Sequence, residues 1–462
     1  MQLAVRATLT SAMQRLRGRR RLLGLGGLPG IALAAEDVRT LAGPAEFRST
    51  LLEQIAQARR RIVLAALYLQ DDAAGREVLE ALHAAKARHP GLQIAVFVDW
   101  HRAQRGLIGK AASAGNAALY TEMARRHGPG VAIRGVPVQT REWMGVMHLK
   151  GFVIDDSVLY SGASLNDVYL HRGDRYRLDR YHLISSRALA DSMAALMTRV
   201  LGNSAAVSPL DCEPRQKTAA LRPAIGRFRR QLATARYSTP ATAGVGELRI
   251  TPLLGFGARD NELNRAILQL VQRARRHLLL FTPYFNLPGP LRRAIEARIR
   301  QGCRVTIIVG DKTANDFYIP TDEAFTTIGA LPYLYEANLR RFCKQHQDAV
   351  DRGLLDLCLW RHENHSYHLK GLLVDDDYAL LTGSNLNPRA WRLDLENGLL
   401  IHDPQGRLAS QHRAEVERIL QHCRRLDHHR SLESVSSYPE PVQRILKRLA
   451  HTRADRLLNQ VL

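Results

Sequence analysis

The sequence predicts an α/β protein in which one α/β sandwich domain occurs twice. Helical periodicity alternates with short apolar strands rich in β-branched residues, an order typical of layered α/β folds. The tripeptide Ala-Arg-Arg also precedes an apolar strand at two places, residues 58–60 and 274–276, which are offset by 216 residues (274 − 58). Because the repeat is only twofold, it indicates two homologous domains rather than a solenoid.

The first domain is expected over residues 36–202. Apolar residues at helical spacing predict a helix ahead of a strand at 62–67. A second helix is expected near 75–87, followed by a strand at 94–98.

The second domain is expected over residues 247–415 and repeats this order. A helical pattern precedes a strand at 278–281, and a second helix near 290–301 leads to a strand at 305–309. The two domains therefore share the order helix, strand, helix, strand.

Two segments lie between and after the domains. Residues 203–246 are rich in Ser, Pro, Ala, Thr and Arg and predict a linker with a helical part at 222–236. Residues 416–462 contain basic amphipathic stretches at 416–426 and 442–462, which predict C-terminal helices. Such helices either pack on their own domain or lie on an anionic bilayer surface.

Residues 1–35 are expected to form a basic leader. A strongly basic run at 15–21 is followed by a mostly apolar run at 22–35 that ends in small residues, which resembles a signal peptide. Its glycines and proline argue against export, and a leader that binds an anionic surface is the preferred interpretation. The sequence has no run of 18 or more apolar residues, so no membrane-spanning helix is expected.

The charge of the chain is strongly positive. Lys and Arg number 66 and Asp and Glu 44, which gives a net charge of +22. This charge favours nucleic acid, an anionic membrane or a phosphate-rich substrate, without choosing among them. The cysteines are scattered without paired spacing, which argues against a disulfide framework or a zinc site and fits a reducing cytoplasm. They are Cys212, Cys303, Cys343, Cys358 and Cys423.

One motif occurs in both domains and carries the chemistry. It reads His-x-Lys-x4-Asp, with Gly-x-x-x-Asn close behind. The residues are His148, Lys150, Asp155, Gly162 and Asn166 in the first domain, and His368, Lys370, Asp375, Gly383 and Asn387 in the second. A single short motif arises by chance, but two copies at equivalent points of a duplicated domain indicate two catalytic histidines.

Each motif predicts a β-hairpin, because two apolar runs meet at an Asp-rich turn. Successive strand residues face opposite sides, so the His and Lys of each motif share one face. Asp155 and Asp375 fall at the turns, where a carboxylate fixes local structure, and we expect their role to be mainly structural.

The paired motif resembles that of the phospholipase D superfamily. This resemblance implies two domains related by a pseudo-twofold axis, with both motifs in one site and no metal or other cofactor. It implies that one histidine attacks a phosphodiester phosphorus, while the other protonates the leaving group and then activates the acceptor. We expect His148 to be the nucleophile and His368 the acid and base, although the sequence does not rank them.

The other motif residues have expected roles in this scheme. Lys150 and Lys370 would stabilise charge on the phosphoryl oxygens, and Asn166 and Asn387 would add neutral hydrogen bonds. Two lysines can replace a divalent ion in this role.

An orienting carboxylate is expected for each histidine. Asp179 follows His148 by 31 residues (179 − 148), and Glu396 follows His368 by 28 (396 − 368). The resemblance implies that each acid supports the histidine of the other half, so that Asp179 orients His368 and Glu396 orients His148. The alternative is that both are surface acids at strand ends.

Longer segments are similar to the phosphatidylserine synthases of Gram-negative bacteria, and the similarity extends over 36–462. The segments that carry it are 98–106, 160–171, 282–288, 310–320 and 387–397. This resemblance implies that CDP-diacylglycerol and L-serine give phosphatidylserine and CMP through a phosphatidyl-histidine. It also implies peripheral binding to the anionic inner face of the cell membrane and association with ribosomes. The alternatives are a cardiolipin synthase or related phosphatidyltransferase, a phospholipase, a nuclease and a non-enzymatic binding protein.

Several residues in these segments are candidates for substrate contacts, with ordinary loop structure as the alternative for each. They are Trp100, Arg102, Arg105, Lys312, Asn315, Asp316 and Tyr318. The two arginines would pair with the cytidine diphosphate, and Trp100 or Tyr318 would stack on cytosine. Asp316 would meet the serine ammonium.

Overall fold

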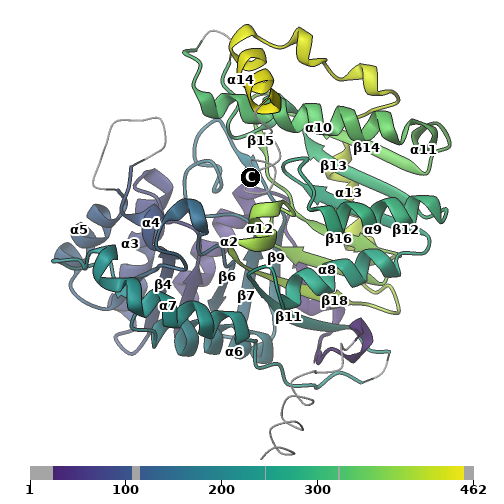
Figure 1. The fold of residues 1–462 in the computed structure, drawn as a ribbon. Coiled ribbons are helices and arrows are strands. Elements are labelled where there is room, and N and C mark those ends of the chain that lie inside the picture. The colour runs from purple at the N-terminus through teal and green to yellow at the C-terminus, as the bar shows by residue number, and fades with distance from the viewer. Residues whose placement is uncertain (1–23, 107–114, 245, 321–322, 452–462) are drawn as a thin grey trace, which may run out of the picture.

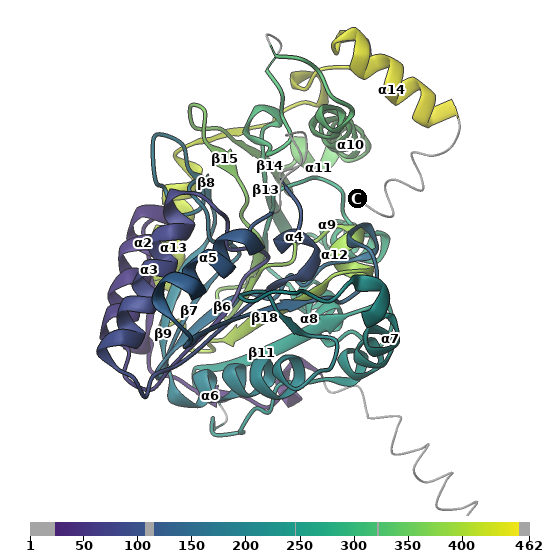
Figure 2. The same ribbon diagram turned by 90° about the vertical axis from the view of Figure 1, so that its left-hand side faces the viewer.

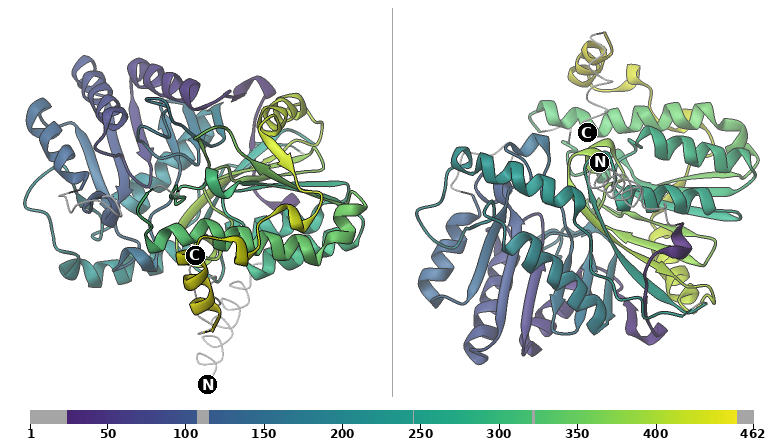
Figure 3. Two further views of the ribbon diagram at one scale, coloured as in Figure 1. Left: turned by 90° about the horizontal axis from the view of Figure 1, so that it is seen from above. Right: turned by 60° about the horizontal axis from the view of Figure 1, so that its bottom comes forward.

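The computed structural model describes residues 24–106, 115–244, 246–320 and 323–451 of the chain. Each half contributes a large mixed β-sheet with helices packed on it (Figure 1). Seen from above, the purple-to-teal first half and the green-to-yellow second half lie side by side (Figure 3). The predicted α/β fold class is confirmed.

The first half contains a sheet in which parallel strands adjoin an antiparallel set. Its strands are β2 (Val38–Thr40), β3 (Arg61–Ala65), β4 (Gln93–Asp99), β5 (Val131–Val136), β6 (Gly151–Ile154), β7 (Ser157–Ser161), β9 (Tyr181–Ser185) and β10 (Ser208–Pro209). The order is β10-β5-β4-β3-β6-β7-β9-β2, with β3, β4 and β5 parallel. Its helices include α2 (Pro44–Gln57), α3 (Ala73–Arg88), α4 (Trp100–Ala103), α5 (Ala117–His127), α6 (Arg187–Leu196) and α7 (Thr218–Thr234).

The second half repeats this arrangement. Its strands are β11 (Arg249–Phe256), β12 (His277–Thr282), β13 (Arg304–Gly310), β14 (Leu355–Trp360), β16 (Gly371–Val374), β17 (Tyr378–Thr382), β18 (Leu395–His402) and β19 (Cys423–Arg425). The run β14-β13-β12-β16-β17-β18-β11 matches β5-β4-β3-β6-β7-β9-β2 in order and direction. Its helices include α8 (Glu262–Arg273), α9 (Gly289–Arg300), α10 (Leu331–Gln345), α11 (Gln347–Asp351), α12 (Pro388–Arg392), α13 (Ala409–Leu420) and α14 (Glu440–His451).

The predicted elements of the repeat are present at shifted ends. The strand expected at 62–67 is β3, and the helix expected near 75–87 is α3. The second copy of this pair, expected at 278–281 and near 290–301, is β12 and α9. The hydrophobic periodicity therefore identified the repeated unit correctly.

Backbone pairing joins the two halves at two related places. A short parallel sheet pairs β8 (Arg177–Leu178) with β15 (Ser366–Tyr367), and the His368 N–H donates to the Leu178 carbonyl at 2.8 Å. The counterpart is a parallel bridge between Met147 and Leu395, beside which the His148 N–H donates to the Leu395 carbonyl at 2.9 Å. Each motif histidine is thus bound through its own backbone to the opposite half.

A shared apolar core also joins the halves. Buried residues of the first half, such as Phe152 and Met193, belong to the same cluster as Ile250, Leu399 and Ile401 of the second. Burial of apolar surface at this scale is the main stabilising term of a fold. The two sheets therefore form one packed body.

The folded part of the chain begins earlier than expected. Residues 24–35 were assigned to the leader, but β1 (Ile31–Ala32) pairs with β11 at the edge of the second sheet. Leu25 is buried in the core of the second half. This part of the leader prediction is wrong, because the open edge of β11 supplies the hydrogen-bond partners that a two-residue strand needs. The basic run at 15–21 lies outside the described residues.

The linker and the C-terminal segments pack on the body. Helix α7 lies within the 203–246 linker and buries Leu221, Ile225 and Phe228. The basic stretch at 416–426 begins inside α13, whose Ile419 is buried. Helix α14 stands beside α10 (Figure 2) and buries Val442 against Tyr333 and Tyr438. Residues 452–462 lie outside the described part.

The Asp155 and Asp375 carboxylates bind the backbone at the start of two equivalent strands, β3 and β12. The Asp155 carboxylate accepts backbone N–H bonds from Arg59, Arg60 and Arg61 at 2.8, 2.8 and 3.0 Å. Asp375 accepts the equivalent three bonds from residues 275–277 at 2.7–2.8 Å. Burial raises the pKa of Asp155, but these N–H donors outweigh burial and leave its pKa below the usual range. The expected structural role fits this geometry.

No helix in the described ranges is long and apolar enough to cross a membrane.

We predict that Asp155→Ala lowers the free energy of unfolding by about 1–3 kcal/mol, because three N–H groups lose their acceptor. Asp156→Ala is the matched control, since it removes only the exposed ion pair with Arg60 and costs about 0–1 kcal/mol. Thermal unfolding midpoints of both variants measure the difference. Equal midpoints would contradict the structural role of Asp155.

Candidate active site

His148 lies against an acid of the opposite half. Both carboxylate oxygens of Glu396 approach His148 Nδ1, at 2.9 and 3.0 Å. His148 lies three residues before the start of β6 (151 − 148), and Glu396 lies in β18. The main-chain bond between His148 and Leu395 aligns the two side chains, because Leu395 precedes Glu396. The expected contact between Glu396 and His148 is present.

His368 has the equivalent contact and an extra neighbour. Its Nδ1 lies 3.3 Å from Oδ2 of Asp179 and 2.8 Å from the Tyr169 hydroxyl. Lys370 Nζ donates to Asp179 Oδ2 at 2.6 Å and also contacts His368 Nδ1. The expected contact between Asp179 and His368 is present as well, so each acid serves the histidine of the other half.

The motif glycines allow the lysines to cross between halves. A Cβ on Gly383 would lie 2.5 Å from Lys150 Cγ, and a Cβ on Gly162 would lie 2.7 Å from Lys370 Nζ. Both distances are shorter than real contacts allow, so each lysine needs a glycine in the opposite motif. Lys150 Nζ then donates to Ser164 Oγ at 3.2 Å. The glycine of the Gly-x-x-x-Asn element is thus explained by close packing.

Burial and positive charge keep both imidazoles neutral. Burial, with the charges of Lys150 and Lys370, holds the pKa of His148 well below its ordinary value. Burial and Lys370 lower the pKa of His368 to about 4. Burial and Lys370 also lower the pKa of Lys150 to about 7. These groups therefore act on one another across the interface of the two halves.

The two acids differ in their ionisation. Burial raises the pKa of Asp179, but Lys370 and the contact with His368 outweigh burial, and its pKa lies below the ordinary value. Burial and the nearby Asp394 hold the pKa of Glu396 well above its usual range. Nearby positive charge thus favours the ionised form of Asp179, whereas burial and a neighbouring carboxyl group disfavour the ionised form of Glu396.

Asn166 and Asn387 lie at the ends of the motifs and support local turns. The Asn166 side-chain oxygen accepts from the Tyr169 N–H at 3.1 Å, and its amide donates to Gln70 at 3.2 Å. The Asn387 oxygen accepts from the Ala390 N–H at 2.9 Å and caps α12. Both side chains are buried.

The expected stacking of Trp100 on cytosine is contradicted. Its side chain is only 1% exposed, and its indole N–H donates to Thr218 Oγ1 at 3.0 Å. Thr218 begins α7, which covers this tryptophan. Trp100 is therefore a core residue of the first half.

Arg102 and Arg105 share one carboxylate. Both guanidinium groups contact Glu142, at 2.7 and 2.5 Å. Two positive charges on one negative charge leave a net positive surface beside the segment that leads to His148.

The four candidates within 312–318 do not all lie in the same environment. Lys312 forms ion pairs with Glu336 and Glu433, at 3.2 and 2.5 Å. Lys312 and Asn315 border a small hollow that Phe285 and Tyr335 also line. Tyr318 lies half-buried, 6.4 Å from Tyr333 between ring centroids.

Asp316 is the candidate of this group that lies near His368. One of its carboxylate oxygens lies 2.8 Å from the Arg177 Nε, and the Tyr284 hydroxyl donates to the other at 3.1 Å. The charge of Asp316 also acts on the pKa of His368. The ion pair of Arg177 and Asp316 thus lies beside the second motif histidine.

Sequence reasoning missed three site residues: Arg177, Tyr169 and Asn397. Arg177 lies two residues before Asp179, and Asn397 directly follows Glu396. The Asn397 side chain accepts from the Lys150 N–H at 2.8 Å and donates to the Lys150 carbonyl at 2.9 Å. For Arg177 and Asn397 the available signal was their position next to the two acids, whereas Tyr169 lies ten residues before Asp179 (179 − 169) and gave no such signal.

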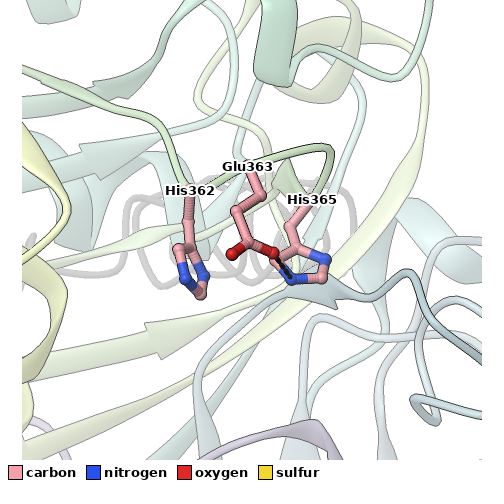
Figure 4. A group of neighbouring side chains, drawn as sticks. All are labelled: His362, Glu363 and His365. Atoms are coloured by element: carbon pink, nitrogen blue, oxygen red, sulfur yellow. Dashed lines mark ion pairs between the residues drawn. The ribbon is translucent and has the colours of Figure 1, made fainter.

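The described residues include one group that could hold a metal ion: His362, Glu363 and His365 (Figure 4). The Tyr176 hydroxyl lies 2.7 Å from His362 Nδ1, and the Tyr176 N–H donates to His365 Nδ1 at 3.2 Å. An imidazole that accepts at Nδ1 carries its proton on Nε2 when neutral, so His365 is poorly disposed to bind a cation. We derive no step from this group.

Comparisons with known proteins agree with the fold and the motifs. The family described as "Cardiolipin synthase, PLD-like domain" matches residues 51–198 and 267–420. The chain is 51% identical over 439 residues to a CDP-diacylglycerol–serine O-phosphatidyltransferase of Escherichia coli, with 95% of this chain and 97% of the relative covered. A relative of the same activity from Haemophilus influenzae is 47% identical over 444 residues, again covering 95% and 97%.

A solved structure gives the same result. The crystal structure of phosphatidylserine synthase from Haemophilus influenzae matches this fold with a TM-score of 0.92 at 47% identity, covering 95% of this chain and 98% of that one. The duplicated fold, the paired motifs and these matches together show that the chain belongs to the phospholipase D-like family and, within it, to the phosphatidylserine synthases of Gram-negative type.

Proposed function

We propose that this protein transfers a phosphatidyl group from CDP-diacylglycerol to L-serine and releases CMP, through a phosphatidyl-histidine intermediate. The observation that carries the proposal is the pair of buried, neutral imidazoles, each held at Nδ1 by an acid of the opposite half. An imidazole bound in this way at Nδ1 presents Nε2 to a substrate. The relatives named above carry this activity in their names.

In the first displacement, His148 Nε2 attacks the phosphorus that bears the diacylglycerol. The new N–P bond forms as the bond from phosphorus to the bridging oxygen of CMP breaks. CMP leaves as a phosphate monoester, whose second pKa is about 6, so it needs little help from an acid. Lys150 and Lys370 stabilise the charge on the phosphoryl oxygens, and the amides of Asn166 and Asn387 add neutral hydrogen bonds.

In the second displacement, the serine hydroxyl attacks the same phosphorus and the N–P bond breaks. His368 accepts the hydroxyl proton, and the ionised Asp179 stabilises the imidazolium that forms. Glu396 contacts His148 Nδ1 in the same way and stabilises the positive charge that His148 gains when the N–P bond forms. In this proposal His148 is the nucleophile and His368 is the acid and base.

The ion pair beside His368 fits the acceptor. Serine is a zwitterion, and an adjacent guanidinium and carboxylate match its two charges. In this proposal Asp316 meets the serine ammonium and Arg177 its carboxylate. A glycerol-type acceptor has no such pair of charges, which distinguishes this proposal from cardiolipin synthesis.

The remaining candidates contact the nucleotide. The net positive surface of Arg102 and Arg105 suits the diphosphate, and Tyr318 is the aromatic ring left for cytosine once Trp100 is excluded. Lys312 and Asn315 border the hollow that Phe285 and Tyr335 also line.

We also propose that the protein acts at the inner, anionic face of the cell membrane, where its diacylglycerol substrate resides. The net charge of +22 and the basic helix α14 support this location. The same charge would attract RNA and ribosomes, an attraction that salt weakens.

The function is tested with CDP-diacylglycerol in mixed micelles containing EDTA. We expect CMP release and phosphatidylserine formation that require serine, and loss of turnover in His148→Asn and His368→Asn. His368→Asn should still release about one CMP per chain, because it blocks mainly the second displacement, whereas His148→Asn should release none. Preference for phosphatidylglycerol or glycerol, or cleavage of plasmid DNA with inert lipid, would contradict the proposal.

The pKa of Lys150 predicts the alkaline limb of the pH profile. Lys150 carries its charge below pH about 7 and loses it above, so kcat/KM should fall as the pH rises through this range. The Lys150→Arg variant keeps its charge over this range. We therefore expect it to be less active than the unaltered protein at low pH, but to keep that activity to higher pH. Lys344→Arg, at an exposed lysine, is the control. An unchanged limb in Lys150→Arg would exclude Lys150 as the titrating group.

The proposed serine site predicts that a substitution of Arg177 changes the KM for serine and leaves the first displacement unchanged. Arg177→Met should raise the KM for serine by about tenfold or more, because a charged contact is lost, while the first CMP release keeps its rate. Arg177→Lys should restore part of the affinity, and Arg222→Met, at an exposed arginine of α7, serves as control. A serine KM equal to that of the unaltered protein would remove Arg177 from the site.

A further inference from the structure

Trp143 is a large apolar side chain that the fold leaves in solvent. It is 60% exposed, whereas Trp100, Trp360 and Trp391 are 1%, 0% and 7% exposed. The described part of the chain contains all four tryptophans of the sequence. An indole that remains this exposed is a candidate contact for a partner with an apolar phase.

The turn that carries Trp143 is held firmly. It is a 3₁₀ turn, Glu142–Met144, and the Arg389 guanidinium donates to the carbonyls of Glu142 and Trp143 at 2.9 and 3.3 Å. A Cβ on the next residue, Gly145, would lie 2.3 Å from the Leu393 carbonyl oxygen, so the turn packs tightly against the second half. The position of the indole is therefore fixed relative to both halves.

The surroundings of the turn are basic. Arg102 and Arg105 share the Glu142 carboxylate, and Arg389 pairs with Asp394 at 3.2 Å. Arg141 is exposed two residues before the indole. More guanidinium than carboxylate groups lie here, which suits a negatively charged surface. An indole among arginines is typical of side chains at the headgroup level of a bilayer.

The turn also lies close to the chemistry. His148 follows Trp143 by five residues, so their Cα atoms are at most about 17 Å apart even along an extended chain. A diacylglycerol substrate keeps its acyl chains in the bilayer while its diphosphate reaches the histidines. The entrance of the site must therefore face the lipid.

We infer that Trp143 inserts into the headgroup region of an anionic phospholipid bilayer and holds the entrance of the active site against it. This inference rests on the proposed lipid substrate. It adds a second contact, next to the catalytic motif, to the contact proposed for α14.

Fluorescence tests the inference directly, because Trp143 is the exposed indole and dominates changes in emission. Phosphatidylglycerol vesicles should shift the emission to shorter wavelength, and brominated acyl chains should quench it. Phosphatidylcholine vesicles should do neither. Unchanged emission from protein that sediments with phosphatidylglycerol vesicles would overturn the inference.

Turnover separates this inference from the proposed function. Trp143→Ala should bind phosphatidylglycerol vesicles about tenfold more weakly and turn over vesicle-borne CDP-diacylglycerol correspondingly more slowly, with its activity in detergent micelles retained. Trp143→Phe should recover most of the vesicle activity. Leu420→Ala, at a 39% exposed apolar residue of α13, is the matched control.

The remaining outcomes are distinguishable. Equal vesicle binding by Trp143→Ala and the unaltered protein would overturn the bilayer contact while leaving the enzyme activity intact. Quenching of Trp143 by CMP without lipid, with weaker inhibition of Trp143→Ala by CMP, would assign the indole to cytosine and also overturn it. Absence of serine-dependent turnover in micelles would instead refute the proposed function itself.

Discussion

The site depends on two backbone hydrogen bonds that cross between the halves. The N–H of His148 binds the Leu395 carbonyl, and the N–H of His368 binds the Leu178 carbonyl. In each case the next residue of the accepting segment is the acid that contacts the imidazole. The main chain therefore sets the position of both histidines relative to their acids. Side-chain rotation alone could not maintain this arrangement, because catalytic geometry tolerates displacements of only about 0.5 Å.

Electrostatics follow from this packing. Lys150 and Lys370 are both buried, and their mutual repulsion in a region of low dielectric contributes to the lowered pKa of Lys150. Positive charge from Lys370 lowers the pKa of Asp179 against the effect of burial, whereas burial and Asp394 raise the pKa of Glu396. The two buried ammonium groups therefore repel each other within the site. A diphosphate would relieve that repulsion, which is a physical reason for a phosphate-rich substrate in place of a divalent ion.

Much of this arrangement could be predicted from the sequence, because the duplication repeats both the strand periodicity and the motif. The repeat placed His148 and His368 at equivalent points of the two domains. Asp179 and Glu396 follow these histidines at similar distances along the chain. Features made by tertiary contacts could not be predicted. Trp100 is buried by a helix more than 100 residues away, and β1 is too short to show a period. The role of Arg177 depends on its pairing with Asp316 across the halves.

The duplication in one chain has a consequence for how the site can change. A dimer of identical subunits would present the same residue at both symmetric positions. Here the halves have diverged: Glu396 precedes Asn397, which binds the backbone of Lys150, whereas Asp179 precedes Arg180, which forms a buried pair with Glu415. Because both halves belong to one chain, the surroundings of the two imidazoles need not be identical. Each imidazole can therefore have a different role in the reaction.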